Sequence, residues 1–288
     1  MPSEKLELTP LTIVGLSDYH CHCDYSIDAV GTIDEYCQAA LERNLAEICF
    51  TTHYDTNPRG DSSDCFIRIK GEKKPAKADN LVPYVDDVKK AHDQFYPRGL
   101  SVKLGIEVGW WEGCAESIIK LMERFPFDYV LGGIHEIDNR SICSPKFADY
   151  FRDYSLERFM ESYYRQAVIA ARSGLFHALA HIGYYVRFGY AHFNQDIYEA
   201  HGPYQNELFE ALKIGDTTLE INTSAIRHGF DQYYPGMQII NSARKNGLWL
   251  RYLGSDAHRP DQVGLDFEAA SALVSDAVSY THLTLPTN

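Results

Sequence analysis

Histidine and carboxylate residues, the side chains that bind most metal ions, recur along this chain in short polar motifs. His20 and His22 form an H-x-H pair near the start, and Asp256 and His258 form a D-A-H motif near the end. Residues two apart on an extended segment point to the same side, about 6–7 Å apart, so both imidazoles of such a pair can reach one cation. One histidine alone is more often a packing or surface residue. The repetition of such motifs indicates a metal site, because burying so many titratable groups without a cation would cost several kcal/mol per unpaired charge.

These polar motifs fall where short apolar runs, typical of β-strands, come to an end. The runs lie at 11–16, 48–50, 102–108, 129–131, 175–180, 219–221 and 248–253. The candidate metal residues at or after the runs are His20, His22, His53, Glu107, His135, His181, Asp256 and His258. Helical patterns alternate with the runs at 32–41, 118–125, 156–171 and 236–245, and the first begins with a T-I-D-E capping box at Thr32 and Glu35.

The alternation of strands and helices predicts the fold. It is typical of a parallel sheet with right-handed crossovers, and at least seven such units without a long linker favour one closed, TIM-like α/β barrel over two separate domains. In a parallel barrel the active site lies at the C-terminal ends of the strands, where the polar motifs fall. We therefore expect a single barrel domain over residues 1–277. Residues 278–288 match no predicted element and read as a non-native or disordered tail.

The longest segment without a predicted element runs from residue 57 to residue 83. It contains prolines, glycines and the basic run K-G-E-K-K-P-A-K, with Lys70, Lys73 and Lys74. A structureless loop of this length is either a functional lid or a mobile surface excursion. The sequence leaves both alternatives open.

The composition is that of a globular protein, and its charge excludes some classes of partner. Apolar residues make up 45% of the chain, and 27 basic against 40 acidic residues give a net charge of −13. Such an acidic surface repels nucleic acid polymers and anionic membranes. No apolar run approaches the roughly 18 residues of a membrane span, the first residues lack the layout of a signal peptide, and seven cysteines without a C-x-x-C pair indicate reduced thiols. We therefore expect a cytoplasmic protein, whose oligomeric state the sequence does not indicate.

The order of the motifs resembles that of the PHP (polymerase and histidinol phosphatase) family. The motifs are D-Y-H-C-H, T-T-H-Y-D, G-I-E-V, D-Y-V-L-G-G-I-H, L-A-H-I-G, L-E-I-N-T-S-A-I-R and G-S-D-A-H-R-P, and they extend from about residue 18 to residue 264. Within the family, the chain is most similar to the monofunctional histidinol-phosphatase branch. The resemblance implies a distorted (β/α)7 barrel that holds two to three divalent metal ions.

The resemblance also implies a role for each candidate ligand. It assigns to the first metal His20, His22, Glu107 and Asp256. It assigns to the second metal His135, His181 and the same Glu107, which bridges the two ions, and to the third metal Asp28, His53 and His258. Glu107, Asp256 and His258 are also the residues that we expect to take part in catalysis. Mixed imidazole and carboxylate ligands suit zinc, manganese or iron and exclude a soft all-thiolate site. Gly109, after G-I-E-V, departs from the family pattern, in which this position is often acidic.

A chain this acidic needs local positive charge to bind a phosphate dianion. Arginine suits the task, because its planar guanidinium binds phosphate oxygens bidentately and stays charged. Arg187 and Arg227 each follow a strand-end motif, so we expect both on the active face; the alternative is that they pair with surface carboxylates. His228 is a candidate to assist substrate binding or to protonate the leaving alkoxide. Trp110 and Trp111, just after Glu107, are candidates for a wall against an imidazole ring.

These observations predict metal-dependent hydrolysis of a small phosphorylated substrate, L-histidinol phosphate, to L-histidinol and phosphate, in histidine biosynthesis. The attacking group is expected to be a hydroxide that bridges the metal ions. No serine, cysteine or aspartate motif for a phosphoenzyme occurs in a suitable context, which favours direct attack by water. Two alternatives stay open. One is a PHP phosphoesterase that acts on another small phosphate or on a nucleotide, and the other is an inactive metal-binding module with a structural or regulatory role.

Overall fold

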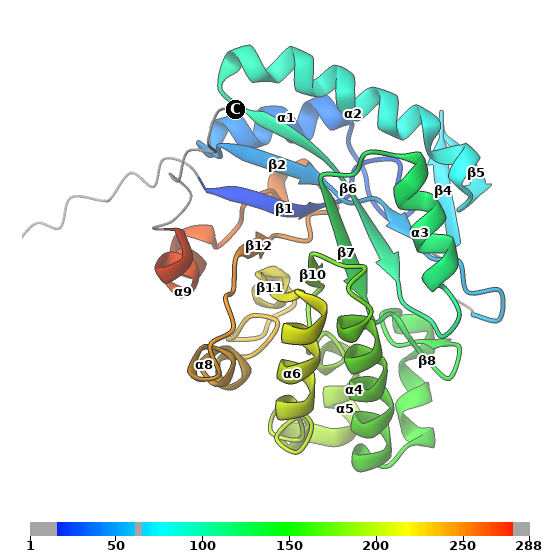
Figure 1. Cartoon of the computed structure of the whole chain (residues 1–288), viewed down its shortest axis with the longest axis vertical. Helices are drawn as coiled ribbons and strands as arrows, with labels where there is room; N and C mark the ends of the chain where they lie inside the picture. The colour runs from blue at the N-terminus through cyan, green and yellow to red at the C-terminus, as the bar shows by residue number, and fades with distance from the viewer. Residues whose placement is uncertain (1–15, 61–64, 279–288) are drawn as a thin grey trace, which may run out of the picture.

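Seven parallel strands form a closed barrel at the centre of the computed structural model, which describes residues 16–60 and 65–278 (Figure 1). In chain order the strands are β1 (Ser17–Cys21), β2 (Glu47–Phe50), β6 (Ser101–Gly109), β7 (Tyr129–Gly133), β10 (Ala178–Leu179), β11 (Thr218–Asn222) and β12 (Tyr252–Gly254). Each strand pairs with the next one in this order, and β12 pairs with β1, which closes the ring. The predicted distorted (β/α)7 barrel is confirmed. A further short strand, β3 (His53–Tyr54), pairs with β6 beyond the end of β2.

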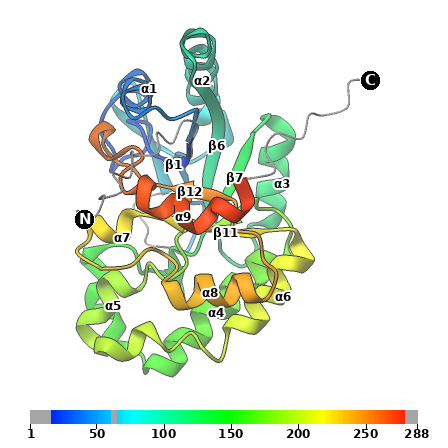
Figure 2. The ribbon, with the colours of Figure 1, turned by 90° about the vertical axis from the view of Figure 1, so that its left-hand side faces the viewer.

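Helices surround the barrel, as two perpendicular views show (Figures 1 and 2). They are α1 (Ile33–Glu42), α2 (Val82–Phe95), α3 (Ala115–Arg124), α4 (Leu156–Arg172), α5 (Val186–Phe193), α6 (Gln205–Gly215), α7 (Ser224–Arg227), α8 (Met237–Lys245) and α9 (Phe267–Val278). The predicted capping box is confirmed, because the Thr32 hydroxyl accepts from the Glu35 amide and the Glu35 carboxylate accepts from the Thr32 amide. No helix among the described residues is long and apolar enough to cross a membrane.

The apolar core lies between the barrel wall and the helices. Tyr84 of α2 is fully buried, and its hydroxyl lies within hydrogen-bond distance of the carbonyls of Phe50 and Gly105, at 2.7 and 2.8 Å. This contact fixes α2 against β2 and β6. Five of the seven cysteines are free thiols buried in the core, namely Cys21, Cys23, Cys37, Cys49 and Cys114. The predicted tail at 278–288 lies outside the described residues except for Val278, which ends α9.

The first barrel strand differs from the prediction. A strand was expected at 11–16, but residues 11–15 lie outside the described part of the chain, and β1 is the polar segment S-D-Y-H-C at Ser17–Cys21. Asp18 is fully buried inside it, and its carboxylate accepts hydrogen bonds from the amides of His20, Ser255 and Gly264, at 2.9–3.2 Å. A carboxylate with three backbone donors can be buried without a counter-charge. The polarity of this segment therefore reflects its role in joining β1 to the loop after β12.

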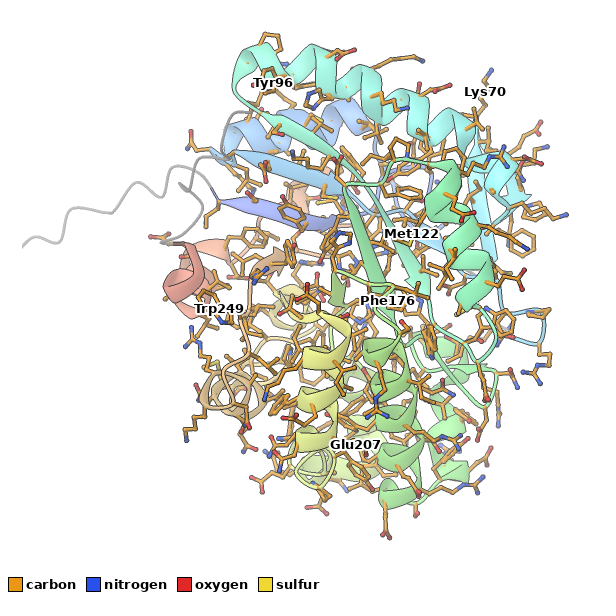
Figure 3. All side chains as sticks on the ribbon, viewed as in Figure 1. Lys70, Tyr96, Met122, Phe176, Glu207 and Trp249 are labelled. Atoms are coloured by element: carbon orange, nitrogen blue, oxygen red, sulfur yellow. The ribbon has the colours of Figure 1, made fainter. Side chains whose placement is uncertain are left out.

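Residues 57–83 were predicted to be irregular, and over residues 66–83 this prediction is wrong, while residues 61–64 lie outside the described part of the chain. β4 (Phe66–Ile69) and β5 (Glu72–Pro75) form an antiparallel hairpin, and the short 3₁₀ helix η2 (Ala78–Leu81) leads from it into α2. The turn residues Lys70 and Gly71 have φ angles of 51° and 81°, as the tight turns of two-residue hairpins require. Lys70 lies exposed at the tip (Figure 3). The other two lysines also stay on the hairpin, with Lys73 over the Phe66 ring and Lys74 paired with Glu72.

Arg68 of β4 fixes this hairpin to the loop that follows β1. Its guanidinium donates hydrogen bonds to four backbone carbonyls between residues 24 and 29, at 2.5–3.2 Å. The Arg68 amide also donates to the carbonyl of Tyr25, at 2.7 Å. The hairpin is therefore a brace for the segment that carries Asp28.

Candidate metal centre

Glu107, at the carboxyl end of β6, is the centre of a buried cluster of histidines. Its side chain is fully buried. Five imidazole nitrogens lie within 2.9–3.4 Å of its two oxygens, those of His20, His22 and His53 at Oε2 and those of His135 and His181 at Oε1. These histidines come from four different strand ends, so the closed barrel is what brings them together. The two oxygens face different sets of nitrogens, an arrangement that suits a carboxylate shared by two cations.

Asp256 extends the cluster from the loop after β12. Its Oδ1 lies 3.5 Å from Nε2 of His20 and 3.3 Å from Nε2 of His22. The backbone φ angle of Asp256 is 52° and that of His181 is 27°, values in the region that L-residues rarely adopt. Such conformations cost of order 1–3 kcal/mol each and cluster at functional sites.

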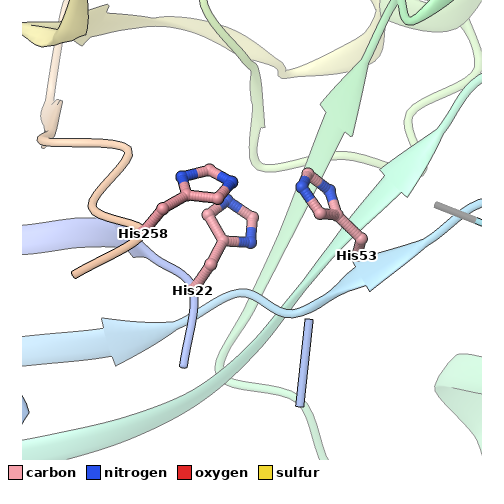
Figure 4. A group of neighbouring side chains, drawn as sticks. All are labelled: His22, His53 and His258. Atoms are coloured by element: carbon pink, nitrogen blue, oxygen red, sulfur yellow. The ribbon is translucent and has the colours of Figure 1, made fainter. Parts of the chain in front are cut away.

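A third group of side chains lies at the open edge of the cluster. The rings of His22, His53 and His258 gather there (Figure 4), with centroids 4.1 Å apart for His22 and His53 and 4.4 Å apart for His22 and His258. Asp28 Oδ2 lies 3.2 Å from Nε2 of His258 and 3.7 Å from Nε2 of His53. The Asp28 side chain is 45% exposed, whereas that of Glu107 is fully buried. This edge is therefore where solvent reaches the cluster.

Buried polar atoms of these residues that lack a hydrogen-bond partner are suited to bind divalent cations. Within the described part of the chain, Nε2 of His20, Nε2 of His22 and Oε2 of Glu107 are buried without a hydrogen-bond partner. Four overlapping sets of three side chains can each place their donor atoms around one point: His22, His53 and His258; His20, Glu107 and His181; His20, His22 and Asp256; His53, Glu107 and His135. Neutral imidazoles with carboxylates are the donors that zinc and similar cations bind. The donor atoms of this cluster can therefore hold divalent cations.

The protonation equilibria of the cluster show how closely its charges interact. Burial opposes ionisation of Glu107, but the imidazoles of His20, His135 and His53 outweigh it and hold the pKa of Glu107 well below its usual value. Burial likewise disfavours the charged form of His20, yet Glu220, Glu107 and Asp256 raise its pKa well above the usual value. His22 behaves in the opposite way, since burial, His53 and His258 lower its pKa well below the usual value. His22 is therefore a neutral imidazole.

Polar residues behind the ligands hold the imidazoles in place. Glu220 of β11 is buried, and its Oε1 lies 2.7 Å from Nδ1 of His20, while its Oε2 accepts from the His181 amide at 2.8 Å. Ser26 lies 3.3 Å from Nδ1 of His22 and accepts from the His53 amide at 3.2 Å. Such partners fix which ring nitrogen is free to bind a cation. The strand-end position of Glu220 points to this role in the sequence, whereas nothing in the sequence around Ser26 indicates its role.

Arg187, Arg227 and His228, the predicted substrate-binding residues, lie beside this centre. Arg227 donates from Nη1 and Nη2 to the carbonyls of Ser255 and Asp256, at 2.7 and 2.9 Å. It therefore contacts the loop after β12 that carries Asp256. Arg187, on α5, donates to the hydroxyl of Tyr184, whose ring lies 4.9 Å from that of His181. Neither arginine has a carboxylate partner among the ion pairs of the described residues.

His228 is uncharged at neutral pH. Burial, together with the positive charge of Arg187, lowers its pKa to about 4. Its Nδ1 is buried without a hydrogen-bond partner in the described part of the chain. The ring is thus available for a hydrogen bond to a ligand, but at neutral pH it does not carry the proton that the predicted transfer to a leaving alkoxide requires.

The tryptophans predicted as a wall for the substrate have other partners. Trp110 is 6% exposed, its indole N–H donates to Gln166 of α4 at 3.1 Å, and its ring meets that of Phe176 edge-on. Trp111 donates to the hydroxyl of Thr56 at 3.2 Å. Trp110 is therefore a core residue between the barrel and α4. The aromatic rings beside the centre are instead those of Tyr184 and Tyr234, which contact each other and His228.

Comparison with known proteins agrees with this geometry. The family model of the PHP domain matches residues 18–224. A Deinococcus radiodurans protein named a probable histidinol-phosphatase is 31% identical over 265 residues, which make up 92% of this chain and 94% of that protein. The histidinol-phosphatase of Lactococcus lactis is 22% identical over 265 residues, which cover 90% of each chain.

The fold also matches a solved structure over most of its length. The crystal structure of histidinol phosphate phosphatase from Lactococcus lactis, complexed with zinc, L-histidinol and phosphate, superposes with a TM-score of 0.70 at 21% identity, covering 91% of this chain and 93% of that one. At this identity the likeness speaks for the fold. Together with the matched family model and the Deinococcus relative, it leads to one conclusion: the chain belongs to the PHP domain family, in its histidinol-phosphatase-like branch.

Proposed function

We propose that this protein is a metal-dependent phosphomonoesterase that hydrolyses L-histidinol phosphate to L-histidinol and phosphate. The observation that carries the proposal is the convergence of five imidazoles on both oxygens of the buried Glu107. The chain has this centre in the same fold as relatives named for histidinol phosphate hydrolysis, one of which is 31% identical over 92% of its length. The ligands and the kinship support the same reaction.

The proposed centre holds two to three ions of zinc, manganese or iron. The first ion is assigned to His20, His22, Glu107 and Asp256, the second to Glu107, His135 and His181, and the third to Asp28, His53 and His258. The distances among these side chains support the first group through His20, His22 and Asp256, and the second through His135 and His181, which both lie beside Oε1 of Glu107. The third group is less separate, because His53 lies close to His22 and His258 and also to Glu107 and His135. His53 faces Glu107 through Nδ1 and Asp28 through Nε2, so it lies between the second and third groups.

The chemistry divides between the ions and the residues around them. Divalent cations, when bound, lower the pKa of water towards neutrality and offset the charge that develops on phosphoryl oxygens. Glu107, Asp256 and His258 are the proposed catalytic residues, because they would hold the ions that take part in the reaction. Arg187 supplies positive charge beside Tyr184, whose ring contacts that of His181, and His228 supplies a neutral hydrogen-bonding nitrogen. The five buried free thiols support the proposed cytoplasmic location.

A substrate panel tests this proposal. Purified protein, supplied with zinc or manganese, is assayed for phosphate release from L-histidinol phosphate, from aryl phosphates and from mononucleotides. We expect kcat/KM for L-histidinol phosphate to be well above that for every other ester. Equal rates across the panel would assign the protein to the broader phosphoesterases, and no phosphate release by the metal-loaded protein would assign it to the inactive metal-binding modules.

The brace formed by Arg68 gives a prediction about the third ion. Replacing Arg68 by Met removes the four guanidinium hydrogen bonds to the loop at 24–29 and keeps an unbranched side chain, while the backbone amide of residue 68 still donates to Tyr25. Because Asp28 lies on this loop, we expect the ion near Asp28 to bind about 10- to 100-fold more weakly, as is typical when a supporting residue is lost. Metal titration followed by elemental analysis measures the effect.

The matched control for this brace is Arg98→Met. Arg98 is exposed, and its guanidinium donates a hydrogen bond to the side chain of Gln38. It should bind all ions as the wild type does. Unchanged affinity for every ion in Arg68→Met would show that the hairpin does not support the third group.

The two arginines should respond differently to replacement. Arg187→Ala removes a charge that faces the substrate space, so we expect KM to rise and kcat/KM to fall roughly 10- to 100-fold, the range for a lost hydrogen bond to a charged group, with metal content unchanged. Arg227→Ala also removes two donors from the carbonyls of Ser255 and Asp256, so we expect it to lower both kcat and metal content. Steady-state kinetics with elemental analysis separates the two. Wild-type kinetics in both Arg187→Lys and Arg227→Lys would remove these residues from the phosphate site.

A further inference from the structure

Asp55 lies directly behind the metal centre and belongs to none of the ligand groups assigned above. It follows β3, two residues after His53, and is 5% exposed. Its carboxylate oxygens lie 3.1 and 3.3 Å from Nδ1 of His135. On the other side of the same ring, Nε2 lies 3.2 Å from Oε1 of Glu107. The imidazole of His135 is thus held between two buried carboxylates, one on each nitrogen.

Two glycines on neighbouring strands leave the space that Asp55 and His135 occupy. Gly109, the last residue of β6, pairs with Gly133, the last residue of β7. A Cβ atom on Gly109 would lie 1.9 Å from Oδ1 of Asp55, and a Cβ atom on Gly133 would lie 2.1 Å from Nε2 of His135. Neither glycine has a positive φ angle, so space and not backbone conformation is what requires glycine at these two positions. The strand ends are therefore shaped around the carboxylate and the imidazole.

A carboxylate on one imidazole nitrogen determines what the other nitrogen can do. The nitrogen that faces the carboxylate carries the hydrogen, which leaves the lone pair of the opposite nitrogen for a cation. We propose that Asp55 is a positioning residue that holds the hydrogen of His135 on Nδ1 and presents Nε2 to the ion shared with Glu107, in a space kept open by Gly109 and Gly133. This inference rests on the proposed metal centre and gives a role to Asp55, the last residue of the T-T-H-Y-D motif, which belongs to none of the assigned ligand groups.

The same geometry allows a carboxylate at this place to come from residue 55 or from residue 109. Because a Cβ on Gly109 would fall on the present position of Oδ1 of Asp55, an acidic side chain grown from residue 109 enters the same volume once Asp55 is shortened. The two residues cannot both carry a carboxylate there, since the side chains would overlap. Each single change should therefore weaken the centre, whereas the double change Asp55→Ala with Gly109→Asp should restore much of it.

The experiment measures zinc binding by competition with a chelator in wild type, Asp55→Asn, Asp55→Ala, Gly109→Asp and the double variant. We expect each single variant to bind the weakest-held ion of the Glu107 pair about 10- to 100-fold less tightly, and the double variant to recover at least about tenfold relative to Asp55→Ala. The second readout is the tautomer of His135 in the zinc-loaded protein, from the ¹⁵N chemical shifts of its ring. We expect the hydrogen on Nδ1 in the wild type and a loss of this preference in Asp55→Ala.

The matched control is Glu47→Gln, which removes a carboxylate at the opposite end of the barrel, where Glu47 accepts from the hydroxyl of Tyr19 at 2.6 Å. Its zinc affinity should equal that of the wild type. Asp55→Asn keeps the shape of the side chain, so it takes the place of Asp55→Ala in both measurements if Asp55→Ala does not fold. Wild-type zinc affinity and an unchanged His135 tautomer in folded Asp55→Asn would overturn the inference. Neither readout uses L-histidinol phosphate, so a wild type that binds zinc but releases no phosphate would refute the proposed function and leave this inference standing.

Discussion

Replacing Glu107 by Gln is expected to lower kcat/KM by about 10³-fold or more, which corresponds to roughly 4 kcal/mol of lost transition-state stabilisation. The reason is that both oxygens of Glu107 face imidazole nitrogens of different groups, at 3.1–3.4 Å for His20, His22, His135 and His181. An amide keeps only one oxygen and no charge, so one of the two proposed ions loses a ligand. At the same time, the positions of the two ions are no longer fixed relative to each other.

Kinetics and elemental analysis of the same preparations check this prediction. We expect at least two divalent ions per chain in the active wild type and fewer in Glu107→Gln. Glu116→Gln is the matched control, since Glu116 is exposed on α3 and pairs only with Lys120. Its activity and metal content should equal those of the wild type. A Glu107→Gln protein that retains two ions and activity within tenfold of the wild type, or an active wild type with fewer than two ions, would contradict the shared-carboxylate account.

The sequence predicts the barrel and the place of the site because both depend on local patterns. Apolar runs alternate with helical ones, and a parallel barrel brings the ends of its strands to one face whatever the intervening residues are. Residues as far apart in the chain as His20 and Asp256 could therefore be assigned to one cluster. In the structure, Nε2 of His20 lies 3.5 Å from Oδ1 of Asp256.

The features that the sequence does not predict depend on contacts between distant segments. Asp18 is polar, yet it lies inside the barrel wall because three backbone amides, two of them from beyond residue 254, donate to its carboxylate. Asp55 follows T-T-H-Y in the sequence like any loop residue, and only the approach of β6 and β7 shows that it contacts His135. The arginines are a similar case, since Arg227 sits at the expected strand end but uses two of its donors on backbone carbonyls.

Metal removal should destabilise the protein, and by more at alkaline than at mildly acidic pH. In the metal-free cluster, burial acts to lower the pKa values of His20, His135 and His258. The neighbouring carboxylates outweigh burial and raise these pKa values. A raised folded-state pKa contributes stability below the unfolded value of about 6.5, and this stability is lost as the pH rises through the folded-state pKa. The pKa of His22 in the cluster and that of His228 beside it are shifted the opposite way, but the three raised values outnumber these two.

Glu107 and Asp256 act at the other end of the pH scale. Their lowered pKa values contribute stability above the unfolded values of about 4, and this stability is lost only as the pH falls through the lower folded-state values. The metal-free protein should thus be most stable between about pH 4.5 and about pH 6.5. Above this window its imidazoles lose the protons that balance the buried carboxylates.

Divalent cations replace these protons, so their stabilising effect should grow as the pH rises. An ion at about 10³ times its Kd stabilises the folded state by roughly 4 kcal/mol, or about 8–16 °C in Tm for a domain of this size. We expect the difference in Tm between zinc-loaded and chelator-treated protein to approach this range at about pH 8.5 and to shrink at about pH 6, because ligand imidazoles must be neutral to bind. Thermal unfolding of both forms across this range measures the difference. An equal or larger difference at the acidic end would mean that protons do not compete with the ions, and that the imidazole–carboxylate cluster is not where the ions bind.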